Sequence, residues 1–254
     1  MARIALVTGG AGGLGFATAA QLAKDGLRIV LTDLTQVAAE RAVAGLHGTE
    51  HLALALDVTS EARVMEVFAL IEKTLGPVSV LAHFAGALDG AARAQGDGIA
   101  DLALASWQRV FDVNAQGTFL LVREMIRWRR KVPVEHGRVI TVSSLAGQMG
   151  GNLAGAGYAS SKAAVLGLTK NVAREVAPLG ITVNALAPGA IDTQMYRDAA
   201  GLAPTDSTVE GATGIPMKRV GIPDEVGAVA AFLASPAAAY LTGQIIAVNG
   251  GSYT

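Results

Sequence analysis

The sequence predicts an α/β fold with a doubly wound sheet of about seven parallel strands and helices on both faces. Seven short runs are apolar almost throughout rather than alternating, as expected of parallel strands covered on both sides. Longer segments with helical periodicity separate these runs, and such alternation builds right-handed βαβ units. No repeat, linker or change of composition interrupts the pattern, so we expect one domain over residues 1–254.

The predicted strands and helices follow one another in regular order. Strands are expected at residues 3–8, 27–33, 51–57, 78–84, 137–144, 181–188 and 244–250. Helices are expected near 13–25, 36–46, 60–75, 106–130, 158–178 and 223–235. The segment 60–75 is the clearest helix, because Ser60 can cap it and Gly76-Pro77 ends it.

The composition excludes several classes of function. With a net charge of −1, nothing draws the chain as a whole to nucleic acid or to anionic membranes. The absence of cysteine excludes disulfides, thiolate metal sites and thiol catalysis, and it fits a cytoplasmic location. The four histidines lack metal-ligand spacing, so no metal is expected. The longest apolar stretch, 226–241, is broken by Pro236 and is too short to span a bilayer.

A glycine-rich turn follows the first predicted strand and opens the first predicted helix. Residues 8–15 read TGGAGGLG, and the spacing of the glycines is a variant of the dinucleotide-binding fingerprint. Glycine permits the tight turn and lets backbone N–H groups approach a pyrophosphate at the helix N-terminus. We therefore expect a cofactor site of the Rossmann type at Gly9, Gly13, Leu14 and Gly15.

Asp33 ends the second predicted strand, in the segment VLTD. A carboxylate here can accept hydrogen bonds from the adenosine ribose hydroxyls, and it repels a 2′-phosphate. The glycine-rich turn holds no lysine or arginine, and Leu34, Thr35 and Gln36 carry no positive charge. The alternative role for Asp33 is to cap the next helix. The complete order of strand, turn, helix, strand and aspartate favours a cofactor role for Asp33 and Leu34, with NAD(H) rather than NADP(H) as the cofactor.

With these features in place, the sequence resembles the short-chain dehydrogenase/reductase family over essentially its whole length. Six motifs besides the turn occur in the family's order. They are Asp57-Val58, Ala85-Gly86, Asn114 in DVNAQGTF, Ser144 in VSSLAG, Tyr158 with Lys162 in YASSK, and Pro188-Gly189 followed by AIDT. One such match is expected by chance, but seven in order are not.

The resemblance implies that Asn114, Ser144, Tyr158 and Lys162 form the catalytic set. A free tyrosine, with a pKa of about 10, is a poor base at neutral pH, and a nearby ammonium group lowers that pKa. Tyr158 and Lys162 lie four positions apart and so share one face of a helix. The family's pattern implies that Lys162 also holds the nicotinamide ribose, that Ser144 binds the substrate oxygen and that Asn114 holds a water. Taken alone, Ser144 would be a strand-end hydrogen-bonding group and Asn114 a local brace.

The resemblance also implies contacts to the rest of the cofactor. Asp57 and Val58 would lie at the adenine, while Ala85, Gly86, Tyr158, Lys162, Pro188 and Gly189 would complete the cofactor site. The Ile191 backbone and the Thr193 hydroxyl would meet the carboxamide of the nicotinamide.

Three departures from the family pattern stand near these motifs. The family's Asn-Asn pair, which helps to brace the sheet, is replaced by His83-Phe84. The spacing from Ser144 to Tyr158 is one residue longer than usual, and the C-terminal VNGG replaces the commoner Val-Asp-Gly-Gly. None of these changes removes a catalytic group.

Two long loops follow strand carboxyl ends, where open α/β sheets bind ligands. One runs from Gly86 to about Ser106. The other runs from Ala190 to about Gly221, and we expect its residues 190–218 to form the substrate loop. Met195, Tyr196 and Met217 suggest a partly apolar pocket. Small residues, including Ala163, Ala164 and Gly167, line the helix after Tyr158. In the family this helix forms subunit contacts, which implies a homotetramer first and a dimer second.

Three functions are consistent with these residues. The first is an NAD(H)-dependent oxidoreductase that transfers a hydride between nicotinamide and a secondary alcohol or ketone, with Tyr158 as acid and base. The second is a 3-oxoacyl thioester reductase, a branch that usually prefers NADPH, which Asp33 disfavours. The third is a dinucleotide-sensing protein without catalysis, and the retained Tyr158 and Lys162 argue against it. The substrate itself is a small molecule that the sequence does not identify.

Overall fold

A computed structural model describes residues 2–89, 98–151, 154–208 and 212–254 of the chain. Within these ranges seven parallel strands form one sheet in the order β3-β2-β1-β4-β5-β6-β7. The predicted α/β fold is therefore confirmed. The strand order reverses between β1 and β4, and ligands of open α/β sheets bind at such a switch point, outside the carboxyl ends of the strands.

Each strand lies inside a segment predicted from its apolar run. The strands are β1 (Ile4–Thr8), β2 (Arg28–Asp33), β3 (Leu52–Ala55), β4 (Val78–His83), β5 (Gly137–Val142), β6 (Ile181–Pro188) and β7 (Ile245–Val248). All residues of β1, β4, β5 and β6 are buried, which explains why the sequence shows no alternation in these segments.

The helices match the periodic segments, with two differences. They are α1 (Gly13–Lys24), α2 (Gln36–Val43), α3 (Glu61–Thr74), α4 (Leu104–Phe111), α5 (Gly117–Lys131), α6 (Leu145–Met149), α7 (Ala156–Val176), α8 (Gln194–Ala200) and α9 (Pro223–Ala234). The single helix predicted at 106–130 is divided by a π-helical turn, Asp112–Gln116. The short helices α6 and α8 were not predicted, since neither is long enough to show a period. Among the described residues, no helix is both long and apolar enough to cross a membrane.

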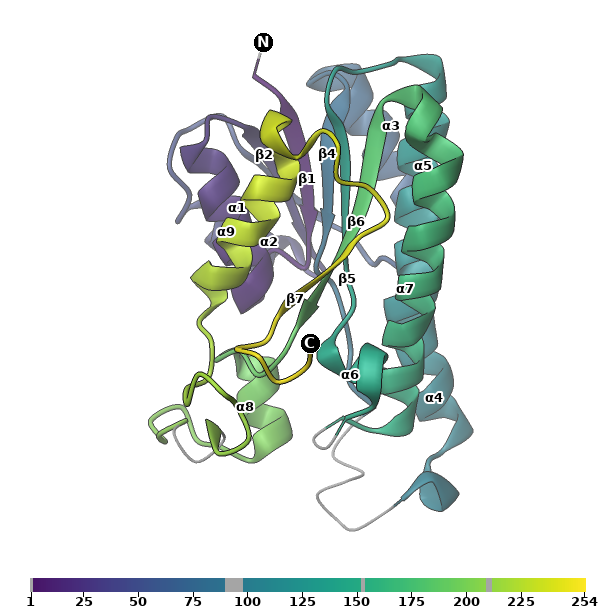
Figure 1. The fold of residues 1–254 in the computed structure, drawn as a ribbon. Helices are drawn as coiled ribbons and strands as arrows, with labels where there is room; N and C mark the ends of the chain where they lie inside the picture. Colours follow the sequence, from purple (N-terminus) through teal and green to yellow (C-terminus); the bar gives the residue numbers. More distant parts are fainter. Residues whose placement is uncertain (1, 90–97, 152–153, 209–211) are drawn as a thin grey trace.

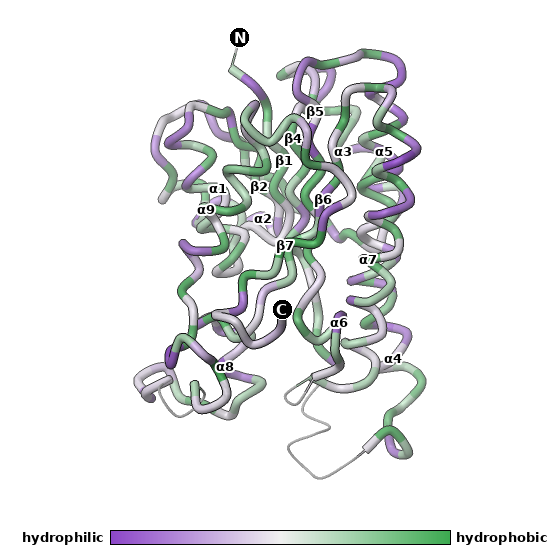
Figure 2. Tube along the Cα trace, viewed as in Figure 1, coloured by the Kyte–Doolittle hydropathy of each residue, from purple (hydrophilic) through white to green (hydrophobic). Residues whose placement is uncertain are grey.

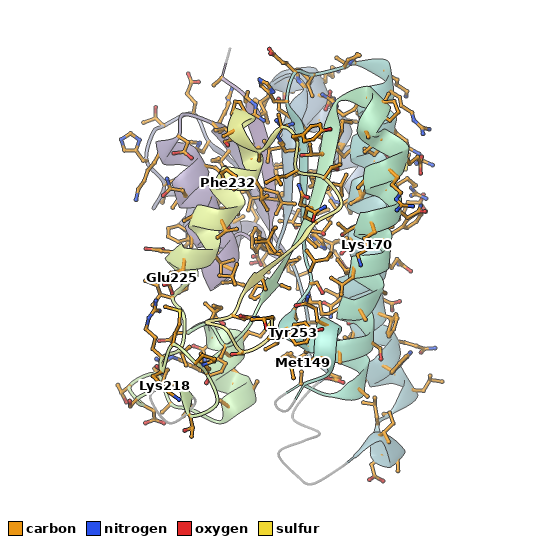
Figure 3. All side chains as sticks on the ribbon, viewed as in Figure 1. Met149, Lys170, Lys218, Glu225, Phe232 and Tyr253 are labelled. Carbon is orange, nitrogen blue, oxygen red and sulfur yellow. The ribbon has the colours of Figure 1, made fainter. Side chains whose placement is uncertain are left out.

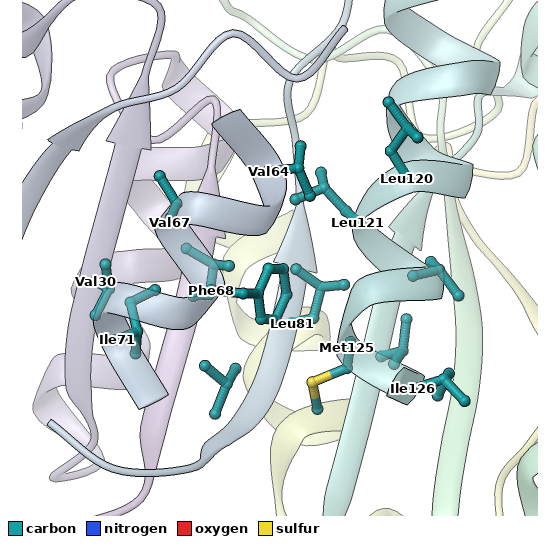
Figure 4. Close-up of a cluster of buried hydrophobic side chains, with 14 of the residues drawn as sticks. Val30, Val64, Val67, Phe68, Ile71, Leu81, Leu120, Leu121, Met125 and Ile126 are labelled. Atoms are coloured by element: carbon teal, nitrogen blue, oxygen red, sulfur yellow. The ribbon is translucent and has the colours of Figure 1, made fainter. Parts of the chain in front are cut away.

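The helices form a layer on each face of the sheet (Figure 1). On one face α1, α2 and α9 pack over small and aliphatic side chains, and α3, α5 and α7 cover the other. Figure 4 shows the hydrophobic core between the sheet and helices α3, α5 and α7. There Phe68 of α3 lies beside Leu81 of β4 and near Met125 of α5. Figure 2 shows hydrophobic residues along the central strands and hydrophilic residues on the outer side of α5. The strands end toward α6 and α8, at the lower end of Figure 1.

An ion pair is enclosed between α3 and α5. Arg129 donates from Nη2 to the carboxylate of Glu72, and the two side chains are only 1% and 4% exposed. Glu72 Oε1 also accepts a hydrogen bond from Val78 N at 3.0 Å. Arg129 belongs to a basic segment at the end of α5, residues 127–131, and tertiary packing buries its guanidinium.

Removing the acid of this pair is expected to cost much more stability than removing an exposed one. Glu72→Ala leaves the Arg129 charge buried without its partner, so the free energy of unfolding should fall by about 3–5 kcal/mol. The matched control is Glu66→Ala, which breaks the exposed pair with Arg63 and should cost about 1 kcal/mol or less. Urea denaturation measures both. Equal losses in the two variants would show that burial does not govern the Arg129–Glu72 pair.

Candidate functional site

The glycine-rich turn packs directly against the loop that follows β4. Gly9 has φ +65°, and a Cβ added there would lie 2.4 Å from Ala85 N, so only glycine fits. A Cβ on Gly15 would lie 2.2 Å from Gly9 O. The helix α1 begins at Gly13 after an N-cap, Gly12, that supplies no side-chain hydrogen bond. The N–H groups of this first turn have no acceptor within the helix and suit a pyrophosphate.

Asp33 is held against this turn. Its Oδ2 accepts a hydrogen bond from Ala11 N at 3.0 Å, and its Oδ1 accepts one from Leu34 N at 2.8 Å. The capping role weighed as an alternative belongs instead to Thr35, whose Oγ1 accepts from Ala38 N at the start of α2. Asp33 is therefore placed beside the turn, and the side chain of Leu34 next to it is 68% exposed.

Asp57 and Val58 lie after β3, away from the cavity described below. Asp57 is exposed, and its Oδ1 accepts hydrogen bonds from Thr59 N at 2.9 Å and Thr59 Oγ1 at 2.7 Å. Val58 is buried, and a Cβ added at Gly117 would lie 2.9 Å from its Cγ2. The expected contact of Asp57 and Val58 with adenine stays a prediction.

Tyr158 and Lys162 occupy successive turns at the start of α7. Lys162 Nζ lies 5.8 Å from the centroid of the Tyr158 ring. The same Nζ donates to Val142 O, at the end of β5, at a distance of 2.8 Å. Burial lowers the pKa of Lys162 to about 8, so the side chain is still mainly a cation at neutral pH.

The pKa of Tyr158 is shifted in the direction opposite to the one expected from Lys162 alone. Burial of the phenol raises the pKa, the hydrogen bond with Ser144 lowers it, and the charge of Asp89 raises it further. The cost of removing a phenolate from water is the largest of these effects. The sequence-based expectation considered the lysine but had no information on burial.

Ser144 serves two purposes. Its Oγ accepts a hydrogen bond from Ala146 N at 3.1 Å and caps α6, as a strand-end serine would. The half-buried side chain also lines the cavity that contains Tyr158 and Lys162. Ser144 therefore lies where a substrate oxygen could reach both its hydroxyl and the Tyr158 phenol.

Asn114 lies in the π-helical turn and braces the site. Its Nδ2 donates to Ala87 O and to Ser161 Oγ, both at 2.9 Å, and its Oδ1 accepts from Ala87 N at 2.8 Å. A Cβ added at Gly86 would lie 3.3 Å from Asn114 Oδ1 and 3.5 Å from Lys162 Nζ. The bracing role weighed as the alternative is thus real, and the expected water on Asn114 stays a prediction. Turns of this kind often occur at functional sites.

A cavity of about 150 Å³ brings these segments together at the carboxyl ends of the strands. The predicted residues that line it are Leu14, Gly86, Ser144, Tyr158, Lys162, Pro188, Gly189, Ile191, Thr193, Met195 and Tyr196. Phe84, Leu88, Val142, Ser143, Ala154 and Ala199 complete the wall. Met217, expected in the same pocket, lines a separate cavity beside Gly250 instead. Among the described residues, no group of three or more acidic or histidine side chains could hold a metal ion.

The glycine-rich turn and the predicted substrate loop also meet. A Cβ added at Gly13 would lie 3.1 Å from Thr193 Cγ2, so no larger side chain fits without displacing Thr193. Thr193 caps α8 by accepting a hydrogen bond from Tyr196 N at 3.2 Å. The predicted substrate loop therefore packs against the glycine-rich turn. Residues 90–97 and 209–211 of the two long loops, and 152–153 between Ser144 and Tyr158, lie outside the described residues.

Sequence reasoning missed three residues that hold α7 in place. Ser143 Oγ donates to Lys162 O at 2.7 Å, and Ser161 Oγ donates to Tyr158 O at 2.8 Å. Asp89 Oδ2 accepts from Tyr158 N at 3.2 Å. The two serines are adjacent to predicted residues, which was a usable signal, whereas nothing in the sequence around Asp89 pointed to α7.

His83 replaces a family asparagine but keeps the bracing role. Its Nδ1 and Thr8 Oγ1 hydrogen-bond at 2.6 Å, which ties the end of β4 to the end of β1. Burial, together with the nearby charge of Lys162, lowers the pKa of His83 to about 3, so the ring is neutral. Phe84 turns to the other side of the sheet and lines the cavity.

Comparison with known proteins finds related reductases that match nearly the whole chain. A family model described as "Enoyl-(Acyl carrier protein) reductase" matches residues 9–253. The chain is 35% identical over 251 residues to a 3-oxoacyl-[acyl-carrier-protein] reductase FabG from Vibrio cholerae, covering 99% of this chain and 97% of the relative. It is 37% identical over 253 residues to the Escherichia coli protein of the same name, with the same two coverages. An acetoacetyl-CoA reductase from Allochromatium vinosum is 34% identical over 258 residues, covering 100% of this chain and 99% of the relative.

Proposed function

The chain belongs to the short-chain dehydrogenase/reductase family, and we propose that it reduces a 3-oxoacyl thioester with NADH. It is an oxidoreductase that acts on a CH–OH group or the matching ketone with a nicotinamide cofactor. The relatives' names favour the thioester, the second of the sequence-based functions, over a simple secondary alcohol. The observation that carries this proposal is a cavity that combines Ser144, Tyr158 and Lys162 with an otherwise mainly apolar wall.

In the proposed reaction the protein binds and orients the ketone and supplies its proton. A bound nicotinamide dinucleotide would supply the hydride for the carbonyl carbon. Ser144 donates a hydrogen bond to the carbonyl oxygen, and Tyr158 transfers its phenolic proton to that oxygen as the alcohol forms. Lys162 carries a positive charge at neutral pH and stabilises the phenolate that remains. Asn114, through Ala87 and Ser161, keeps these groups in register.

Several segments would hold the cofactor. The first turn of α1, at Gly13, Leu14 and Gly15, fits the pyrophosphate because its backbone N–H groups are uncapped. Asp33 would bind the adenosine ribose, and its fixed carboxylate supports NADH over NADPH. Lys162 would hold the nicotinamide ribose. Leu34, Asp57 and Val58 would contact the adenosine, and Ala85, Gly86, Pro188 and Gly189 would line the remainder.

The wall formed by the substrate loop, residues 190–218, supports a neutral, partly apolar substrate. Arg197 makes a bidentate pair with Asp192, at 2.6 and 2.8 Å, so its charge is already matched. Arg219 is similarly paired with Glu225, and the exposed side chain of Lys218 lies at the outer edge of the loop (Figure 3). No described side chain of this loop therefore offers an unmatched cation to a free carboxylate inside the cavity. An acyl thioester needs none.

The substrate class is tested by comparing a thioester with its free acid. With NADH, kcat/KM for the pantetheine thioester of 3-oxobutyrate should exceed that for free 3-oxobutyrate by about 100-fold or more, because the free carboxylate would be desolvated with no unmatched cation of the substrate loop to pair with it. Cyclohexanone and a 2-enoyl thioester should be poor substrates. If cyclohexanone is the better substrate, the secondary-alcohol function replaces this one. Turnover of the enoyl thioester alone would point to reduction of a carbon–carbon double bond.

We also propose that copies of the chain associate through α5 and α7, with a homotetramer as the first assembly and a dimer as the second. The groove between these helices, about 350 Å³, is lined by apolar residues including Phe119, Ile126 and Val172, and by charged residues such as Arg123 and Glu175. Phe119 is 43% exposed, and Ala163, Ala164 and Gly167 on the outer side of α7 allow close approach. Sedimentation velocity measures the mass of the assembly, and a monomer would contradict the proposal.

A further inference from the structure

Asp89 is a buried carboxylate to which the proposed mechanism gives no role. It lies in the segment after β4, six positions beyond the last residue of that strand, and is 5% exposed. Its Oδ2 accepts a hydrogen bond from the backbone N–H of Tyr158 at 3.2 Å. The first N–H groups of a helix have no acceptor within the helix, and α7 has an N-cap, Gly155, that supplies no side-chain acceptor. Asp89 supplies that acceptor from another part of the chain.

Two glycines at the start of α7 leave room for the Asp89 side chain. A Cβ added at Gly155 would lie 2.3 Å from Asp89 Oδ2, and one added at Gly157 would lie 3.1 Å from the same oxygen. The side chain of Trp107, on α4, is 3.6 Å from the position of the Gly157 Cβ. The carboxylate is therefore enclosed by the first turn of α7, and its position and that of Tyr158 depend on each other.

The charge of this carboxylate acts on the phenol. Asp89 raises the pKa of Tyr158, in the same direction as burial, whereas the Ser144 hydrogen bond lowers it. The other titratable or charged side chains around this turn are Lys162 on α7, His83 at the end of β4, Tyr196 on α8 and Arg109 on α4. Of these, His83 is neutral, and Arg109 donates to Leu88 O at 2.6 Å.

We propose that Asp89 is a positioning residue for Tyr158, which caps the first turn of α7 from another part of the chain and whose negative charge acts on the phenol. The charge adds to the effect of burial in favouring the protonated phenol, which is the form that ketone reduction requires. Asp89 would thus extend to higher pH the range over which Tyr158 can donate its proton. This inference rests on the proposed role of Tyr158 as acid and base.

The charge is tested with Asp89→Asn, which keeps an oxygen acceptor for Tyr158 N but removes the negative charge. In the oxidation of a 3-hydroxyacyl thioester with NAD⁺, kcat should rise with pH as Tyr158 deprotonates. The pH of half-maximal kcat should move to a lower value in Asp89→Asn. The matched control, Asp101→Asn, removes an exposed charge from the same long loop and should leave the profile in place. A profile of Asp89→Asn that superimposes on the wild type would overturn the role of the charge.

The cap is tested with a double-mutant cycle. Gly155→Ala should displace the Asp89 carboxylate and lower kcat about tenfold or more, with little change in the KM for NAD⁺, since the first turn of α7 would shift. In an Asp89→Ala background the new methyl group has room, so Gly155→Ala should cost much less. Equal costs in both backgrounds would overturn the cap. Activity of Tyr158→Phe separates the two proposals: if that variant stays active the proposed function fails, whereas failure of Asp89 alone leaves Tyr158→Phe inactive.

Discussion

Replacing Tyr158 by phenylalanine is expected to lower kcat about 10²- to 10⁴-fold in both directions, because the only group removed is the one that donates or accepts the substrate proton. The ring stays in place, so the packing around α7 should be preserved. Binding of NADH should remain within a few fold of the wild type, because the pyrophosphate turn and Lys162 are unchanged. Steady-state rates and fluorescence titration with NADH measure the two properties.

The control for this variant is Tyr240→Phe. Tyr240 is fully exposed and lies after α9, so loss of its hydroxyl should change neither rate nor binding. Wild-type turnover in Tyr158→Phe would show that another group transfers the proton. Loss of NADH binding together with activity would instead indicate that Tyr158 acts mainly in cofactor binding.

A preference for NADH over NADPH of about 100-fold in kcat/KM is the second large effect that we expect. The 2′-phosphate of NADPH would lie beside Asp33, and two like charges held together cost several kcal/mol. Each 1.4 kcal/mol corresponds to about a tenfold change. Because hydrogen bonds from Ala11 and Leu34 fix the Asp33 carboxylate, it cannot simply rotate away.

Asp33→Asn should narrow this preference to about tenfold or less, mainly by improving the use of NADPH. Asparagine keeps an oxygen for Ala11 N, so the glycine-rich turn should retain its shape. Asp25→Asn also removes one negative charge, at the exposed end of α1, and should leave the ratio of kcat/KM for NADH and NADPH unchanged. A wild-type enzyme that prefers NADPH would contradict the cofactor assignment without affecting the role of Tyr158.

Most of the fold could be predicted from the sequence because local signals agree with the tertiary structure. The strands β1, β4, β5 and β6 are buried on both faces, so their apolar runs are continuous, and Ser60 caps α3 as its position predicts. The π-helical turn at Asp112–Gln116 could not be predicted, since its residues continue the helical pattern on either side. It places Asn114 against Ala87 and Ser161, contacts that depend on how distant segments pack.

In the candidate site, too, residues within motifs could be predicted, whereas effects of tertiary packing could not. Ser144, Tyr158 and Lys162 were found through their motifs, and they line one cavity. The direction of the pKa shift of Tyr158 was not found, because it is dominated by burial and includes the charge of Asp89, which lies 69 positions away in the chain. Likewise, Met217 was expected in the pocket because it belongs to the substrate loop, but it lines a separate cavity beside Gly250.

The transfer of deuterium to C3 of a 3-oxoacyl thioester, from NADH that carries deuterium at both C4 positions, tests the central claim most directly. Mass spectrometry of the product should show one deuterium per molecule in the 3-hydroxyacyl thioester, formed in equal amount to the NADH consumed. The Tyr158→Phe variant should form this product at a rate lower by about 10²- to 10⁴-fold. Consumption of NADH without a labelled 3-hydroxyacyl product, or formation of that product by Tyr158→Phe at the wild-type rate, would contradict the account.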